Sequence, residues 1–201
     1  MSTTLAQRAL PLGNATIRNI LLAVAGSLIV AAAAQVKVPF WPVPMTLQTM
    51  AVLLVGGAYG MRLGAATIGL YMLEGAIGLP FFAGGKSGLF DDKLSYLLPA
   101  STMGYVVGFI LAAALVGYLA QTGWINSAAR MVLATLLGAA IVYVPGLLWL
   151  GAWAMMTQGF DLATAVPTTL EWGFYPFLIG DALKATIAGL CLSASWNALK
   201  A

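Results

Sequence analysis

The sequence predicts an all-α integral membrane protein of six transmembrane helices, forming one domain over residues 1–201, and three observations support this fold class. Hydrophobic residues make up 61% of the chain and charged residues only 7%, whereas a soluble domain carries about 25% charged residues. Apolar runs recur along the whole length, and each is close to the roughly 20 residues that one bilayer crossing needs. Turn-forming residues separate the runs.

The apolar runs define the expected helices in order. We expect spans at about residues 17–34, 46–60, 63–79, 101–120, 129–156 and 173–198. The breaks between them fall in the proline-rich segment 39–44, at Gly60, in the Pro- and Gly-containing segment 80–88, in the polar segment 121–127, and in segment 159–167. The fifth span contains Pro145 and Gly146, so we expect it to be kinked or tilted.

The distribution of Lys and Arg predicts the orientation. With six crossings, one side collects only cations: Arg8, Arg18, Arg62, Arg130 and Lys200. The other side collects a mixture of both signs: Lys37, Lys86, Lys93, Asp91, Asp92, Asp161 and Glu171. Because Lys and Arg are enriched in cytoplasmic loops, we expect the N and C termini inside. The run 20–34 ends in Ala-x-Ala like a cleaved signal peptide, but the topology needs this span, so we expect it to be retained.

The residue content argues against an enzyme. The chain has no His and one Cys, Cys191, which excludes a disulfide within the chain and His/Cys metal sites. We expect Cys191 to be a packed core thiol. The segment Gly84–Ser87 resembles the end of a phosphate-binding loop, but Pro80 occupies the place of the required first glycine. We therefore expect no cofactor, and any ATP dependence must come from another subunit.

Polar residues inside the predicted spans are the candidate functional groups. A charge near the centre of a transmembrane helix costs about 2.5–3.5 kcal/mol on insertion scales, which marks Asp181, Lys184 and Glu74. Asp181 and Lys184 are three residues apart and share one helix face, so together they suit a ligand with both N–H and C=O groups. The alternative is an ion pair that only neutralises itself. For Glu74 and Gln48, the alternative to a ligand-binding role is that each side chain lies at a helix end and faces water.

The connector between the first two spans, residues 35–46, is rich in proline and aromatic residues and cannot be helical. Such a connector suits a protein that holds a small molecule at the membrane face. The expected outer side also carries most of the aromatic residues, which either line a pocket or form an interfacial belt. The first span carries small residues four apart, Ala23, Ser27 and Ala31, a pattern that lets helices approach closely in lipid.

Several motifs resemble the biotin-specific S components (BioY) of energy-coupling factor (ECF) vitamin transporters. The resemblance covers roughly residues 17–195 and is carried by segments 43–49 (VPMTLQT), 56–60, 75–85, 104–109 and 180–184 (GDALK). It implies a six-helix S-component bundle in the bacterial cytoplasmic (inner) membrane that captures biotin outside and delivers it inside. It also implies association with a transmembrane coupling subunit and two cytoplasmic ATPase subunits, which some family members are reported to do without.

The resemblance also implies roles for individual residues. We expect Asp181 to accept a hydrogen bond from the ureido N–H of biotin, and Lys184 to donate to the ureido oxygen or to the valerate carboxylate. Gln48 and Glu74 complete the polar contacts, and the aromatic residues Trp41, Phe82 and Tyr105 cover the thiophane ring. The partner-docking surface is expected at Ala23, Ser27 and Ala31.

Two rival functions remain open at this point. One is a proton-coupled or solitary carrier for biotin or another small vitamin, with Glu74 or Asp181 as the proton site. The other is a membrane assembly factor whose connector binds only a protein partner. Retention of a vitamin by the purified protein distinguishes a carrier from an assembly factor.

Overall fold

The computed structural model of the chain describes residues 4–11, 13–88 and 100–200; the acidic and basic residues predicted at 91–93 lie outside this range. Six helices of the described part coincide with the predicted spans: α2 (Ala15–Gln35), α3 (Gln48–Tyr59), α4 (Met61–Ala76), α5 (Met103–Gln121), α6 (Ala128–Gln158) and α8 (Leu178–Ala198). A short helix α1 (Leu5–Ala9) and two 3₁₀ turns, η1 (Trp124–Asn126) and η2 (Tyr175–Phe177), flank them.

Length and composition separate two kinds of helix in this bundle. Four segments of the described chain are long and apolar enough to cross a membrane: Ala15–Gln35, Met103–Gln121, Ala128–Gln158 and Leu162–Ala198. Helix α3 has only 12 residues and α4 has 16. At 1.5 Å per residue, these two helices are about 18 and 24 Å long, less than the roughly 30 Å of a hydrocarbon core. The protein is therefore a multi-pass membrane protein in which α3 and α4 are the short elements.

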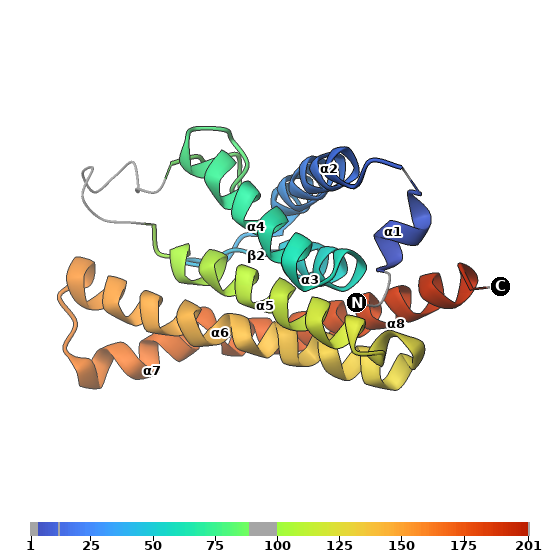
Figure 1. Cartoon of the computed structure of the whole chain (residues 1–201). Coiled ribbons are helices and arrows are strands. Elements are labelled where there is room, and N and C mark those ends of the chain that lie inside the picture. The colour runs from blue at the N-terminus through green and yellow to red at the C-terminus, as the bar shows by residue number, and fades with distance from the viewer. Residues whose placement is uncertain (1–3, 12, 89–99, 201) are drawn as a thin grey trace.

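Helix α5 is the centre of the bundle. It packs against α6, α3 and α4, while α8 packs on α6 and α3, and α2 packs on α4 and α3. Figure 1 shows α2, α3 and α4 on one side of α5, and α6 and α8 on the other. Small residues allow the closest approaches: a Cβ added to Gly56 of α3 would lie 2.7 Å from the backbone of Ala113 on α5.

The predicted connector, residues 35–46, is not helical apart from Gln35, the last residue of α2, and the non-helical segment extends over residues 36–47. It folds back on itself through two short antiparallel strands, β1 (Lys37–Val38) and β2 (Met45–Thr46), in which Lys37 pairs with Thr46. The connector therefore returns to the bundle at the N-terminus of α3, beside the first turns of α8.

One predicted break is shorter than expected. Residues 159–167 were expected to interrupt the helices; residues 159–161 do separate α6 from the next helix, but the rest of the segment belongs to α7 (Leu162–Gly173). The carboxylate of Asp161 caps α7 by accepting a hydrogen bond from the Thr164 amide at 2.9 Å, and this hydrogen bonding lowers the pKa of Asp161. Pro167 lies inside the helix, which membrane proteins tolerate when neighbouring groups satisfy the freed backbone. Helix α7 then packs on α6.

Two further expectations are corrected by burial. Of the three residues expected at the docking surface, Ser27 and Ala31 are 0% and 6% exposed and Ala23 is half-buried, because the small face of α2 packs on α4 and α3 of its own bundle. The neighbouring Gly26 shows how close this packing is, since an added Cβ would meet Thr67 and Tyr59 at under 3 Å. Cys191, expected in the core, is exposed.

The contact between α3 and α5 predicts a packing defect. Gly56→Ala places a methyl group against the backbone of Ala113, which cannot rotate away, so we expect a loss of about 1–3 kcal/mol of stability from overpacking. The measurement is the thermal unfolding midpoint of the purified protein in detergent. Gly69→Ala on α4 is the matched control, because nothing lies within 4 Å of its added Cβ. Equal midpoints for the two variants would contradict the close packing.

Candidate ligand-binding site

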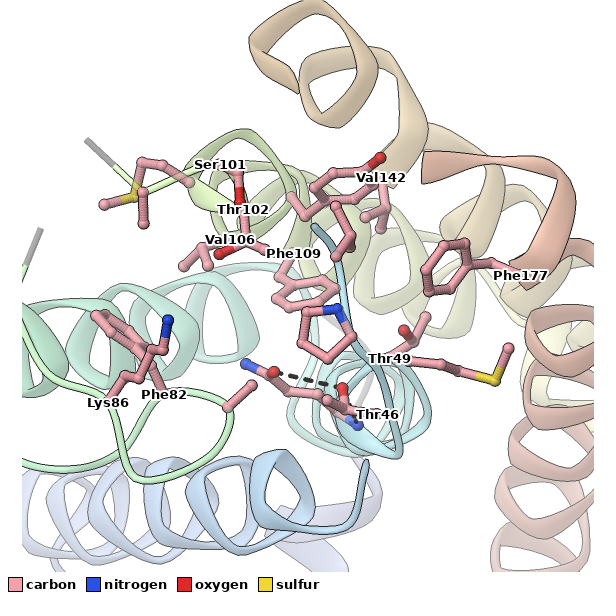
Figure 2. A pocket seen from close by; sticks show the side chains of 18 of the residues that line it. Thr46, Thr49, Phe82, Lys86, Ser101, Thr102, Val106, Phe109, Val142 and Phe177 are labelled. Carbon is pink, nitrogen blue, oxygen red and sulfur yellow. Dashed lines mark hydrogen bonds between the residues drawn. The ribbon is translucent and has the colours of Figure 1, made fainter. Parts of the chain in front are cut away.

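A cavity of about 160 Å³ opens where the connector, the loop 82–88 and the helices α5, α6 and α8 meet. We call this cavity the pocket. Figure 2 shows Phe82 and Lys86 on one side of the pocket and Val142 and Phe177 on the other. The pocket therefore collects residues from segments far apart in the sequence, and its walls combine apolar side chains with a few charged and hydroxyl groups.

The Asp181–Lys184 pair is the polar centre of the pocket. The Lys184 ammonium lies 2.6 Å from Oδ1 of Asp181, and both side chains are largely buried, with about a tenth of their surface exposed. The second carboxylate oxygen, Oδ2, accepts a hydrogen bond from the Tyr143 hydroxyl of α6 at 2.5 Å. Each oxygen of the carboxylate thus has its own partner, as a buried charge requires.

Lys184 also links α8 to the connector. Its ammonium donates to the backbone carbonyl of Thr46 at 2.8 Å. Because Thr46 belongs to β2, this bond holds the connector against the same carboxylate–ammonium pair that lines the pocket. One of the three N–H groups of the ammonium remains for another acceptor.

A second polar group enters the pocket from α3. The side-chain amide of Gln48 is only 5% exposed and donates to the hydroxyl of Tyr71 on α4 at 2.7 Å. Tyr71 in turn donates to the carbonyl of Phe81 at 3.3 Å. The chain of hydrogen bonds connects the start of α3 to the loop that carries Phe82, which packs edge-on against the Tyr71 ring.

Aromatic and aliphatic side chains form the rest of the walls. Tyr105 lines the pocket and anchors α5 to the end of α7 by donating to the carbonyl of Gly173 at 2.9 Å. Its ring meets Tyr143 edge to face. The remaining apolar lining comes mainly from Val43, Met45, Val106, Phe109 and Phe177. Such a mixture of an apolar wall and few convergent polar groups is typical of a small-molecule site.

The structure brings together five of the seven residues predicted to bind a substrate: Asp181, Lys184, Gln48, Phe82 and Tyr105 all line the pocket. The other two lie outside its lining. Trp41 is 66% exposed and packs edge-on against Trp172 of α7. Glu74 is half-buried, and its Oε2 is buried without a hydrogen-bond partner in the described chain.

Tyr143 and Tyr71 also line the pocket but were not among the residues predicted to bind a substrate. Both hydroxyls lie inside apolar helices, although Tyr is normally enriched at the membrane interfaces. A buried Tyr hydroxyl usually has a hydrogen-bond partner. A tyrosine in the middle of a span was therefore the signal that could have indicated a polar site.

A multi-helix membrane bundle with a polar-centred pocket at one end defines a membrane protein that binds a small solute. Comparison with known proteins identifies the family within this class of membrane proteins. Residues 4–201 match the BioY family, and the chain belongs to this family. The family and the structural match described next are transporter components rather than enzymes.

Curated relatives and one solved structure agree with this assignment. The chain is 33% identical over 157 residues to "Biotin transporter BioY" of Thermotoga maritima, covering 78% of this chain and 83% of the relative. It is 31% identical over 155 residues to "Probable biotin transporter BioY" of Pyrococcus horikoshii, covering 77% and 82%. The fold matches the crystal structure of "the S-component for biotin from an ECF-type ABC transporter" with a TM-score of 0.66 and 22% identity, over 91% of this chain and 93% of that chain.

The ion pair predicts non-additive stability effects. Lys184→Met and Asp181→Asn each remove one partner of the buried pair, so each variant should unfold at a lower temperature in detergent. The double variant should lose less than the sum, with a coupling of about 1–3 kcal/mol. Asp181→Asn combined with Arg130→Met is the control, because Arg130 lies in the first turn of α6, at the other end of the bundle. Additive effects at Asp181 and Lys184 would show that the two charges do not interact.

Proposed function

We propose that this protein is the biotin-binding transmembrane subunit of a transport system and takes up biotin through the pocket. The observation that carries the proposal is the buried Asp181–Lys184 pair at the centre of a pocket in a BioY family chain. The cyclic urea of biotin has two N–H donors and one C=O acceptor. A carboxylate and an ammonium side by side match these groups, and the apolar walls suit the thiophane ring.

Binding at this site is an exchange of hydrogen bonds. The carboxylate of Asp181 is already satisfied by Lys184 and Tyr143, so a ureido N–H shares or replaces one of these donors. An analogue without the ureido group leaves the remaining N–H of Lys184 without an acceptor, and an unpaired buried polar group costs about 1–3 kcal/mol. We therefore assign selectivity to the polar centre and affinity to the apolar lining.

The pocket faces the outside and the termini are cytoplasmic in this proposal. Two of the cations predicted on the cytoplasmic side do lie together, at the end of the bundle opposite the connector. The Arg8 guanidinium lies 4.4 Å from the centre of the Trp196 ring, and the Lys200 ammonium lies 5.3 Å from it. A cytoplasmic position of this cluster follows the Lys/Arg bias of membrane proteins. The four long segments and the two short helices α3 and α4 then all cross the bacterial cytoplasmic membrane.

ATPase partner subunits energise the uptake in this proposal. The sequence has no phosphate-binding loop of its own, and the solved S-component with the same fold is described as part of an ECF-type ABC transporter. We propose a transmembrane coupling subunit and two cytoplasmic ATPase subunits as the partners. Their contact cannot use Ser27 and Ala31 as these are placed here, because both are buried within the bundle.

A carrier that works alone or with protons is the second candidate. The observation that favours it is Oε2 of Glu74 in α4, which is buried and has no hydrogen-bond partner among the residues that the structure describes. Ionisable groups inside membrane spans often mark proton paths. The pocket residues do not distinguish the two candidates, so the energy source decides between them.

Charge removal at the polar centre should weaken biotin binding. Asp181→Asn and Lys184→Met should each raise the dissociation constant about tenfold, because each variant leaves a ureido group without its charged partner and an unpaired buried polar group costs about 1–3 kcal/mol. Calorimetry with the purified protein measures the constant. Leu183→Ala on the same helix is the control, since Leu183 is 60% exposed and should leave affinity unchanged. If both charge variants bind biotin as tightly as the parent protein does, biotin does not bind at Asp181 and Lys184.

The energy source can be tested in proteoliposomes that contain the chain with its coupling and ATPase subunits. Biotin accumulation should require ATP on the cytoplasmic side and persist when a protonophore collapses the proton gradient. Vesicles that contain the chain alone should bind biotin without accumulating it. Accumulation driven by an imposed proton gradient without ATP would instead support the second candidate.

A further inference from the structure

Two cations from opposite ends of the sequence meet on one aromatic ring. The Arg8 guanidinium of α1 lies 4.4 Å from the centre of the Trp196 ring of α8, and the Lys200 ammonium lies 5.3 Å from it. Figure 1 shows α1 and the end of α8 at the same end of the bundle, away from α7. We call Arg8, Asn126, Trp196 and Lys200 the terminal cluster. None of these four residues lines the pocket, so the proposed transport function does not use them.

The terminal cluster is built on a fixed aromatic platform. Trp196 is only 7% exposed, and its Nε1 donates to Oδ1 of Asn126 at 2.9 Å. The Lys200 ammonium donates to the same oxygen, and the side-chain amide of Asn126 donates to the Gly123 carbonyl at 2.9 Å. Because the ring is buried and its N–H has a partner, it holds both cations in place, and each cation gains a cation–π contact.

The positive charge at this end is not matched within the described chain. The exposed Arg8 side chain makes no hydrogen bond or ion pair with any residue that the structure describes, apart from the ring contact. No acidic residue occurs in α1, in η1 or in the described chain after Lys184. Three further cations lie near the starts of α2, α4 and α6 at the same end: Arg18, Arg62 and Arg130. Like charges repel, so an anion held between Arg8 and Lys200 is favourable.

The terminal cluster lies at the depth of lipid headgroups. Helix α8 has 21 residues, so at 1.5 Å per residue it is about 31 Å long, the thickness of a hydrocarbon core. Trp196 and Lys200 at its C-terminal end therefore lie at the boundary between hydrocarbon and headgroups. Tyr118, which is 52% exposed near the end of α5, and Trp124 of η1 lie at the same end of the bundle, where interfacial aromatic residues are expected.

We propose that the terminal cluster binds the phosphate of an anionic phospholipid. The guanidinium of Arg8 is a planar fork of donors that binds two phosphate oxygens, and Lys200 supplies a second positive charge. The acyl chains extend along the apolar surface of α8, where Ile187 and Leu190 are 42% and 48% exposed. A bound headgroup relieves the repulsion between the two cations and fastens α1 to α8. Free phosphate offers the same anion without the acyl chains, so the test separates the two.

Native mass spectrometry of the purified protein in neutral detergent measures the dissociation constant of the first lipid retained. The parent protein should bind phosphatidylglycerol at least about tenfold more tightly than phosphatidylcholine, whose headgroup has no net charge. Arg8→Gln and Lys200→Gln should each weaken phosphatidylglycerol binding about fivefold, because each Lys or Arg near an anionic lipid contributes about 1 kcal/mol. Phosphatidylcholine binding should not change in either variant.

Arg130→Gln is the matched control. Arg130 is an exposed cation at the same end of the bundle, but the described contacts to the Trp196 ring come from Arg8 and Lys200. This variant should keep the parental affinity for phosphatidylglycerol, and all three variants should bind biotin as the parent does. Equal binding of the two lipids by the parent, the same loss in Arg130→Gln, or displacement of phosphatidylglycerol by inorganic phosphate would each overturn the lipid site.

Discussion

The need to satisfy every charge from within the bundle is the constraint on which the site depends. A carboxylate in an apolar setting is stable only with partners. Asp181 pairs with Lys184, one turn along α8, and accepts a hydrogen bond from Tyr143 on α6. Lys184 in turn donates to the Thr46 carbonyl of the connector. Without further contacts, the two charges of the pair would only neutralise each other within α8. Its two outside partners tie three elements together around a cavity, so the same interaction both holds the connector and creates the polar centre of the pocket.

Close helix packing keeps this polar centre in register. Lipid provides no hydrophobic force between helices, so small residues that permit close contact carry much of the association. Gly56 sets α3 against α5, and Gly26 with Ser27 and Ala31 sets α2 against α4. The stripe on α2 therefore serves the interior of the bundle, and α2 presents larger side chains such as Leu28 and Ile29 to its surroundings.

The sequence predicted the six helices, because long apolar runs bounded by Pro and Gly have few alternatives in a membrane, and it predicted the Asp181–Lys184 contact, because spacing alone places the two on one face. Prediction from the sequence was wrong or incomplete where the packing of distant segments determines the position of a residue. The cap at Asp161 turned a Pro-containing break into α7. The inward direction of Ser27 followed from neighbours that no local pattern shows. Trp41 reached Trp172 instead of the pocket lining. Tyr143 and Lys86 became site residues only when α6 and the loop 82–88 folded back toward α8.

The partners that Asp181 already has also constrain how a ligand gains affinity, since Lys184 lies at one carboxylate oxygen and the Tyr143 hydroxyl at the other. A ureido group that replaces the Tyr143 hydroxyl exchanges one hydrogen bond for another, and such an exchange contributes little net free energy. The polar centre therefore rejects wrong ligands more effectively than it attracts the right one. Attraction has to come from apolar area removed from water against Phe82, Phe109 and Phe177, and from any charge that stays matched.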